Sequence, residues 1–133
     1  MCGIAAIYNI KESKEDNLTI IRQILQNISH RGPDQQNHIS VNQCYLGIAR
    51  LSIIDLKNGS QPIVDSTKRF HIVFNGEIYN YLFLKKELEN LNYNFNTNSD
   101  TEVVLYSYIQ WGEKFAKKLD GMFSIIIYDK INN

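Results

Sequence analysis

Apolar residues in the first quarter of the chain change from a continuous run to a helical spacing. Residues 2–8 (CGIAAIY) form a short apolar run that is typical of a buried strand. Asp16 and Asn17 are good N-cap residues. They precede an amphipathic helix predicted over 18–28, with an apolar face formed by Leu18, Ile21, Ile24, Leu25 and Ile28. We expect residues 30–34 (HRGPD) to end this helix, because Gly and Pro interrupt helical geometry.

The next part of the chain predicts short strands separated by turns. Residues 38–41 and 44–49 have the composition of two strands, and Asn42-Gln43 lies between them as a turn. Residues 51–54 add a further short apolar stretch, and Asn58-Gly59 marks another turn. The pattern therefore predicts antiparallel pairing in this region.

The last third of the chain predicts two helices followed by a strand. Asn80 is expected to cap a helix whose apolar face consists of Tyr81, Leu84, Leu88 and Leu91. Asp100 is expected to cap a second helix over 101–111, which ends at Gly112. A short helix over 113–118, a turn at Asp120-Gly121 and a strand over 122–128 follow. Strands with segregated helices, without regular βαβ alternation, indicate an α+β layered fold.

Composition and charge exclude several classes of protein. Apolar residues make up 44% of the 133 residues and charged residues 21%, as in ordinary globular domains. Fourteen basic residues balance fourteen acidic ones, so no net field would attract nucleic acid or a membrane surface. No apolar run is long enough to cross a bilayer, and we see no secretory signal. Two cysteines do not make a disulfide framework, so we expect a reducing, cytoplasmic location.

Cys2 is a candidate nucleophile. If Met1 is removed, Cys2 carries a thiol and a free α-amine on the same carbon. The thiolate is a strong nucleophile, and an α-amine is partly unprotonated near neutral pH. One residue would then supply both the nucleophile and the base that covalent acyl transfer needs. The cysteines and the three histidines show no spacing typical of a metal site, so we expect no metal.

Asn75-Gly76 has two interpretations. Residues 70–74 (FHIVF) predict a strand, and residues 77–79 predict the second strand of a hairpin. The dipeptide between them is the favoured choice for a type I′ hairpin turn. Alternatively, the Asn75 amide and the Gly76 N–H could converge on a developing negative oxygen as an oxyanion hole. The local sequence alone favours the turn.

One basic and two acidic residues could together bind an amino acid. Arg50 ends an apolar run, where an arginine either reaches the surface or binds a carboxylate. Glu77 and Asp100 taken singly fit a surface charge and a helix cap. Taken together, the arginine would bind an α-carboxylate and the acids an α-ammonium. Only a feature that connects these segments would favour the second interpretation.

Seven short motifs supply that connection. In order and spacing they resemble the class II glutamine amidotransferase domain, and within it the glutamine-hydrolysing asparagine synthetases. The resemblance covers the whole chain. The motifs are CGIAAIYN at the N-terminus, HRGPD at 30–34, LGIARLSIIDL at 46–56, GSQPI at 59–63, FNGEIYNY at 74–81, SDTEVVL at 99–105 and LDGMFSIIIYD at 119–129.

The resemblance implies a fold and a role for each candidate residue. The fold would be the N-terminal-nucleophile αββα four-layer sandwich, incomplete at its C-terminal end because the family's domain continues with further strands. Cys2 would attack the side-chain amide of L-glutamine. Asn75 and Gly76 would form the oxyanion hole, and Arg31 and Asp34 would have structural roles. The substrate-binding residues would be Arg50, Leu51, Ser52, Ile53, Ile54, Asn75, Gly76, Glu77 and Asp100.

The resemblance also implies a partner domain. Residues 1–133 would be a truncated glutaminase domain, and the ammonia would pass to a synthetase domain, in cis or in trans, that activates aspartate with ATP and Mg. No cofactor is expected in this chain itself. Two alternatives stay open: an amidotransferase of the same type with another ammonia acceptor, and a truncated module that binds glutamine without turnover.

Overall fold

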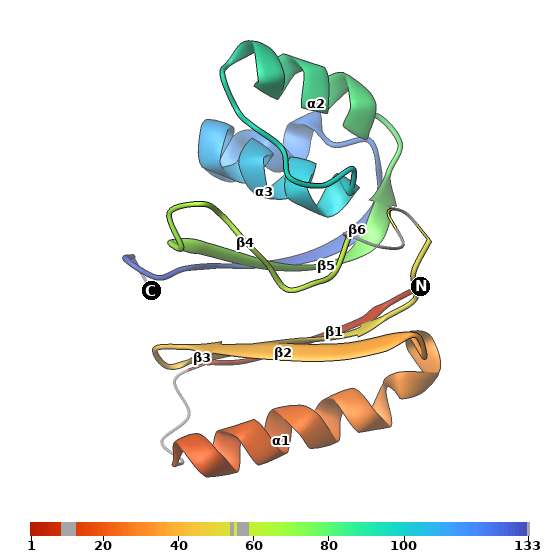
Figure 1. The fold of residues 1–133 in the computed structure, drawn as a ribbon, viewed down its shortest axis with the longest axis vertical. Helices are drawn as coiled ribbons and strands as arrows, with labels where there is room; N and C mark the ends of the chain where they lie inside the picture. The colour runs from red at the N-terminus through yellow and green to blue at the C-terminus, as the bar shows by residue number, and fades with distance from the viewer. Residues whose placement is uncertain (9–12, 54, 56–58, 133) are drawn as a thin grey trace.

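Two three-stranded antiparallel sheets face each other, and helices cover their outer sides in the order α, β, β, α (Figure 1). This computed structural model describes residues 1–8, 13–53, 55 and 59–132. The α+β fold and its layering therefore agree with the sequence pattern and with the sandwich that the family resemblance implies. No helix in the described part of the chain is long and apolar enough to cross a membrane.

The first sheet has the strand order β1-β3-β2. Its strands are β1 (Gly3–Tyr8), β2 (Gln35–Val41) and β3 (Cys44–Arg50), and Asn42 in the β2–β3 turn has a positive φ of 52°. All seven residues of the central strand β3 are buried. Helix α1 (Lys14–Asn27) packs on the outer face through Ile21 and Leu25, and a 3₁₀ helix (Ser29–Arg31) follows it. The predicted hairpin over 38–41 and 44–49 is thus confirmed.

The second sheet has the strand order β4-β5-β6. It consists of β4 (Ile63–Val64), β5 (Phe70–Ile78) and β6 (Gly121–Asp129), and β5 pairs with β6 over its whole length. Helices α2 (Tyr81–Asn90) and α3 (Asp100–Trp111) cover its outer face, and a 3₁₀ helix (Gly112–Lys118) leads from α3 to β6. Gly112 ends α3 with a φ of 58°, as the sequence predicts.

The two faces of β5 serve two different cores. Ile72 and Phe74 pack with the buried residues of α2 and α3, whereas Val73 packs between the sheets against Leu46 and Ile48 of β3. Successive side chains of a strand point to opposite faces, so one strand can belong to both cores. The strand is buried over His71–Phe74, whereas Asn75 and Gly76 are partly buried and Glu77 is exposed.

Two predicted helix caps are wrong, and a third, Asn80, lies at the N-cap position of α2 without a side-chain capping hydrogen bond. Ser13, not Asp16 or Asn17, caps α1, because its hydroxyl accepts the N–H of Asp16 at 3.1 Å. The helix therefore begins four residues before the predicted start, in a polar turn that apolar periodicity does not detect. Ser99, not Asp100, accepts the N–H of Thr101 at the start of α3. The Asp100 carboxylate instead accepts the Ile78 N–H of β5 at 3.3 Å.

The predicted hairpin turn at Asn75-Gly76 is also wrong. Strand β5 runs through both residues without interruption, and Gly76 lies opposite Phe123 of β6. A Cβ on Gly76 would lie 2.2 Å from the Met122 carbonyl oxygen, so the close approach of β6 explains the glycine. Pairing with a strand far away in the sequence therefore overrides the turn preference of this dipeptide. The turn predicted at Asn58-Gly59 lies partly outside the described residues.

Candidate functional site

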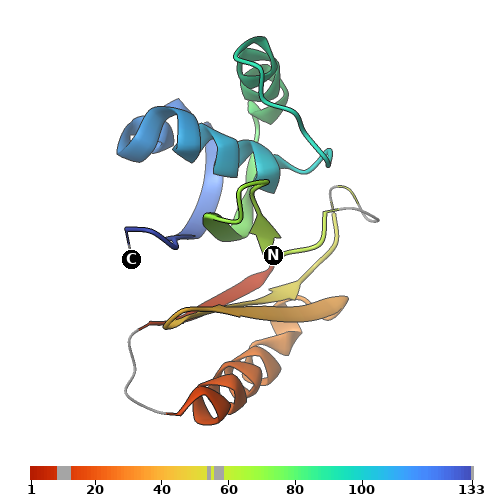
Figure 2. The same ribbon diagram turned by 60° about the vertical axis from the view of Figure 1, so that its left-hand side comes forward.

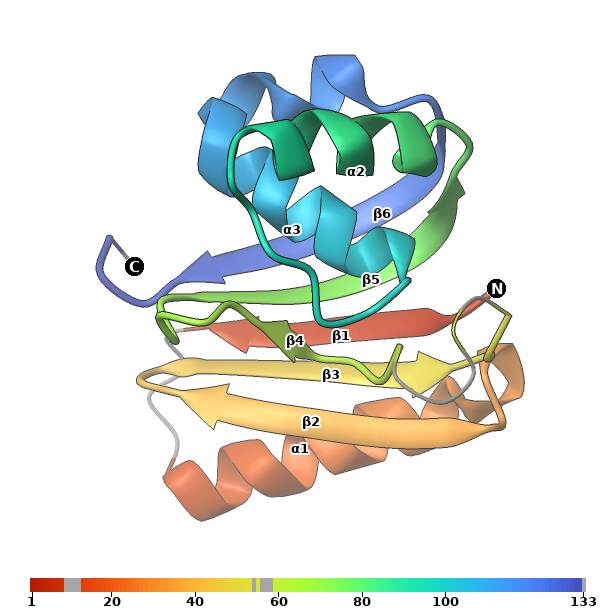
Figure 3. The same cartoon turned by 45° about the horizontal axis from the view of Figure 1, so that its top comes forward.

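Segments that are distant in the sequence meet at one end of the sandwich and line a pocket. Figures 2 and 3 show the N-terminus at this end, beside the carboxyl end of β3. The other walls come from the second half of β5 and the first turn of α3. The lining residues are Met1, Cys2, Arg50, Leu51, Ile53, Gly59, Gln61, Phe74, Asn75, Gly76, Glu77, Ser99, Asp100, Thr101 and Met122.

Cys2 is held beside the end of β3. Its Sγ accepts the Leu51 N–H at 3.3 Å and lies 3.6 Å from the Leu51 carbonyl oxygen. The carbonyl oxygen of Cys2 accepts a hydrogen bond from Nε of Arg31 at 3.1 Å. The next residue, Gly3, is paired with Ala49 in the β1–β3 ladder. The position of Cys2 is therefore set by the Leu51 backbone, the Arg31 side chain and the β1–β3 ladder, and Cys2 is only partly buried.

The HRGPD segment supports this end of β3. Asp34 Oδ2 accepts the Ser52 N–H at 2.7 Å, and the Asp34 N–H donates to the Arg50 carbonyl at 3.1 Å. A Cβ on Gly32 would lie 2.2 Å from the Ala49 carbonyl oxygen, so the segment can pass this closely only with glycine there. These contacts agree with the structural roles expected for Arg31 and Asp34.

Arg50 is a buried cation in the pocket wall. Its side chain is 6% exposed, and its guanidinium donates to the Asp55 carbonyl at 3.1 Å. Of the two interpretations of an arginine at the end of an apolar run, the surface position is therefore wrong. A guanidinium presents several N–H donors in a planar fork, and this geometry matches a carboxylate.

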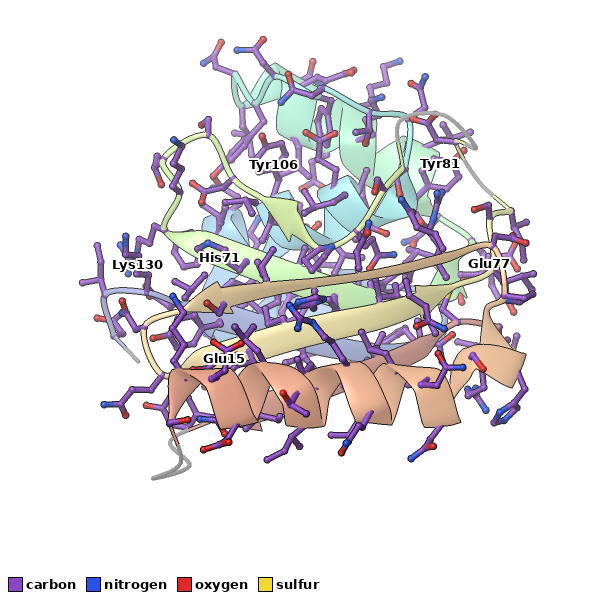
Figure 4. All side chains as sticks on the ribbon, turned by 60° about the horizontal axis from the view of Figure 1, so that its bottom comes forward. Glu15, His71, Glu77, Tyr81, Tyr106 and Lys130 are labelled. Carbon is purple, nitrogen blue, oxygen red and sulfur yellow. The ribbon has the colours of Figure 1, made fainter. Side chains whose placement is uncertain are left out.

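The two acids differ in burial. Asp100 is 4% exposed and accepts the Ile78 N–H at 3.3 Å, whereas Glu77 is exposed at the pocket rim. Burial raises the pKa of Asp100 above its usual range, and the charge of Glu77 raises it further. Figure 4 shows Glu77 toward the same end of the molecule as the carboxyl end of β3, with His71 toward the other end of β5. A ligand cation between the two carboxylates would relieve their repulsion.

Asn75 and Gly76 present polar groups to the pocket from β5. Asn75 Oδ1 is buried, and no hydrogen-bond partner for it occurs among the described residues. A buried polar atom without a partner costs about 1–3 kcal/mol, and such atoms call for an explanation such as a catalytic role. The internal structure of the domain therefore leaves the Asn75 Oδ1 acceptor unsatisfied.

The pocket brings together nearly all of the predicted site residues. Cys2, Arg50, Leu51, Ile53, Asn75, Gly76, Glu77 and Asp100 all line it. Ser52 is not among the lining residues, and its backbone N–H donates to Asp34. Ile54 lies outside the described residues.

Several lining residues were not predicted, and Gln61 is the most informative of them. Gln61 is 5% exposed and bonds to β5 and α3. The GSQPI motif contains it, but a glutamine in a loop has no local pattern that indicates burial. Within the part of the chain that the structure describes, no three His, Cys, Asp or Glu side chains are placed to hold a metal ion.

Comparison with known proteins identifies relatives over nearly the whole chain. The family model described as "Glutamine amidotransferase domain" matches residues 1–133. Asparagine synthetase [glutamine-hydrolyzing] 1 of Bacillus subtilis (strain 168) is 44% identical over 132 residues, which cover 98% of this chain and 21% of the relative. A probable asparagine synthetase [glutamine-hydrolyzing] of Schizosaccharomyces pombe is 40% identical, over 98% of this chain and 23% of the relative. The chain thus spans about a fifth of the length of these relatives.

Solved structures share the fold. The glutamine phosphoribosylpyrophosphate amidotransferase of B. subtilis matches with a TM-score of 0.54 and 22% identity, over 66% of this chain and 21% of that chain. A structure of an allosteric regulatory enzyme of purine biosynthesis matches with a TM-score of 0.56 and 24% identity, over 66% and 22%. At this level of identity the match concerns the fold alone.

Proposed function

Because the chain belongs to the glutamine amidotransferase domain family, we propose that it hydrolyses the side-chain amide of L-glutamine to glutamate and ammonia. The observation that supports this most is the pocket itself. It holds a thiol, a buried guanidinium and two carboxylates, contributed by separate segments. These groups match the reacting amide, the α-carboxylate and the α-ammonium of one glutamine molecule.

The proposed reaction proceeds through a thioester. Once Met1 is removed, the α-amine of Cys2 accepts the thiol proton through a water molecule, and Sγ attacks the amide carbon. The carbonyl oxygen becomes an oxyanion, which the Asn75 amide and the Gly76 N–H stabilise. The carbon–nitrogen bond then breaks, and the protonated α-amine gives its proton to the leaving ammonia. Water adds to the γ-glutamyl thioester, releases glutamate and restores the thiol.

The family also supports a proposal for where the ammonia goes. Since the curated relatives are asparagine synthetases, we assign aspartate, activated by ATP with Mg in a synthetase domain in cis or in trans, as its acceptor. Because the proposed nucleophile is the N-terminal Cys2, we also assign the sandwich to the N-terminal-nucleophile class. Asparagine formed from aspartate, ATP and glutamine by the full-length protein supports the assignment. Ammonia release without asparagine formation favours another acceptor.

The direct test of the proposed activity is ammonia release from glutamine by full-length protein that begins at Cys2. Glutamine is expected to be a substrate. Asparagine, one methylene shorter, should react far more slowly, because its amide carbon cannot reach Sγ while its charged groups are bound. Glutamine binding without ammonia release would instead support a non-catalytic binding module.

Replacing Arg50 by alanine should raise the KM for glutamine with little change in kcat. A charge-assisted hydrogen bond contributes ~1.5–3 kcal/mol, which corresponds to roughly a 10- to 150-fold increase in KM. Steady-state kinetics measure the effect. Arg69→Ala is the control, because Arg69 pairs with Asp129 at 2.6 Å and does not line the pocket. An unchanged KM in Arg50→Ala would exclude Arg50 as the carboxylate-binding residue.

Asp100→Asn should stabilise the fold near neutral pH and weaken glutamine binding. The pKa of Asp100 is raised in the folded chain, so its stabilising contribution is present at acid pH and is lost as the pH rises through the folded pKa. The increase in Tm should therefore be largest near neutral pH and disappear at acid pH. Thermal unfolding at several pH values tests this, and Glu77→Gln, which removes only the repulsion from an exposed charge, should raise Tm less than Asp100→Asn. A lower Tm for Asp100→Asn at neutral pH would contradict the prediction.

A further inference from the structure

The side chain of Gln61 pairs with the backbone of β5 as a neighbouring strand would. Its Oε1 accepts the Phe74 N–H at 2.7 Å, and its Nε2 donates to the Phe74 carbonyl at 3.2 Å. Strand β4 begins nearby at Ile63, which pairs with Ile72 of β5. The amide of Gln61, which precedes β4, therefore extends the edge pairing by one residue pair beyond the start of β4.

The same edge of β5 contains the proposed oxyanion hole. Backbone N–H groups alternate between the two sides of a strand, so those of Phe74, Gly76 and Ile78 point the same way. Phe74 bonds to Gln61, and the Ile78 N–H donates to Asp100 Oδ2 at 3.3 Å. Gly76 lies midway between these two fixed points, and its N–H faces the pocket side of the strand.

Gln61 also connects this edge to α3. Its Nε2 donates to Thr101 Oγ1 at 3.2 Å, and Thr101 follows Asp100 directly. Both Gln61 and Thr101 are buried, with 5% and 1% of their surface exposed. A single amide thus joins the strand that carries Asn75 and Gly76 to the helix that carries Asp100.

We propose that Gln61 is a positioning residue, which sets the oxyanion hole on β5 at the correct distance from the α-ammonium site on α3. This inference rests on the proposed glutaminase function. The γ-amide and the α-ammonium are opposite ends of one substrate, so a shift of β5 relative to α3 misplaces the reacting carbonyl even when glutamine is bound. Displacements of about 1 Å can lower a rate by roughly a hundredfold.

Gln61→Met keeps the length of the side chain and removes its three hydrogen bonds. In full-length protein that begins at Cys2, we expect kcat for glutamine hydrolysis to fall about 10- to 100-fold, with KM changed less than about threefold. Alkylation of Cys2 by iodoacetamide should keep its wild-type rate, because it needs no oxyanion hole.

Asn80→Leu is the matched control. Asn80 also makes two hydrogen bonds to the backbone, at Lys118 and Asp120, but it does not line the pocket.

Thr101→Val is a milder variant that removes only the contact between Gln61 and α3. We expect kcat to fall about three- to tenfold, so this variant tests the inference even if Gln61→Met fails to fold. Wild-type kcat in Thr101→Val, or equal losses of kcat in Gln61→Met and Asn80→Leu, would overturn the inference alone. A wild-type protein that releases no ammonia from glutamine would overturn the proposed function as well.

Discussion

Replacing Cys2 by alanine is expected to reduce glutamine hydrolysis at least about a thousandfold in protein that begins at residue 2, because loss of a covalent nucleophile removes the whole thioester route. The fold should be unaffected. Cys2 is only partly buried, and β1 begins at Gly3, after it. Ammonia release and thermal unfolding of the same preparations measure the two effects.

The other cysteine is the matched control for this prediction. Cys44 is 4% exposed within β3, and burial raises the pKa of its thiol to about 11. A thiol that is buried and protonated is a poor nucleophile, so Cys44→Ala should keep wild-type kcat and KM. Substantial activity in Cys2→Ala, or loss of activity only in Cys44→Ala, would show that Cys2 is not the nucleophile.

The second large effect is expected for Asn75→Ala, which should lower kcat about 100- to 1,000-fold with little change in KM. The Asn75 amide stabilises charge that develops only after the thiol attacks, so its removal affects the transition state and not the bound substrate. Asn75 Oδ1 has no hydrogen-bond partner among the described residues, so its removal breaks no hydrogen bond of that atom. Burst kinetics would show slower formation of the thioester.

Arg50→Ala provides the contrast for Asn75→Ala. Arg50→Ala should change KM and Asn75→Ala should change kcat, although both residues line the same pocket. If Asn75→Ala raised KM and left kcat unchanged, Asn75 would be a binding residue and the oxyanion hole would have to lie elsewhere. A large decrease in Tm would instead indicate a structural role.

The sequence predicts those parts of the fold that depend on local pattern. The β2–β3 hairpin, the apolar face of α1, the buried positions Leu84 and Leu88 of α2 and the end of α3 at Gly112 agree with periodicity and turn preferences, whereas Leu91 is exposed just beyond α2. The caps at Ser13 and Ser99 were missed, because several neighbouring polar residues have similar capping preferences and only the three-dimensional structure selects one. The two-residue strand β4 is too short to produce a pattern.

In the candidate site, the difference between what local pattern predicts and what tertiary contacts determine is larger. Local preference at Asn75-Gly76 favours a turn, whereas the structure shows a continuous strand whose glycine accommodates the Met122 carbonyl. The family resemblance predicted most of the pocket because it relates distant motifs to one another. Neither approach assigned a role to Gln61, because its contacts join the 59–63 motif to β5 and α3 and exist only in the folded chain.

The central claim is that glutamine is hydrolysed through a γ-glutamyl thioester on Cys2. The most direct test is to mix protein that begins at Cys2 with glutamine, quench with acid within one turnover and analyse the peptides by mass spectrometry. We predict a γ-glutamyl group on the peptide that contains Cys2 and none on the peptide that contains Cys44. Release of ammonia with no adduct on Cys2, or with the adduct on another residue, would contradict the account.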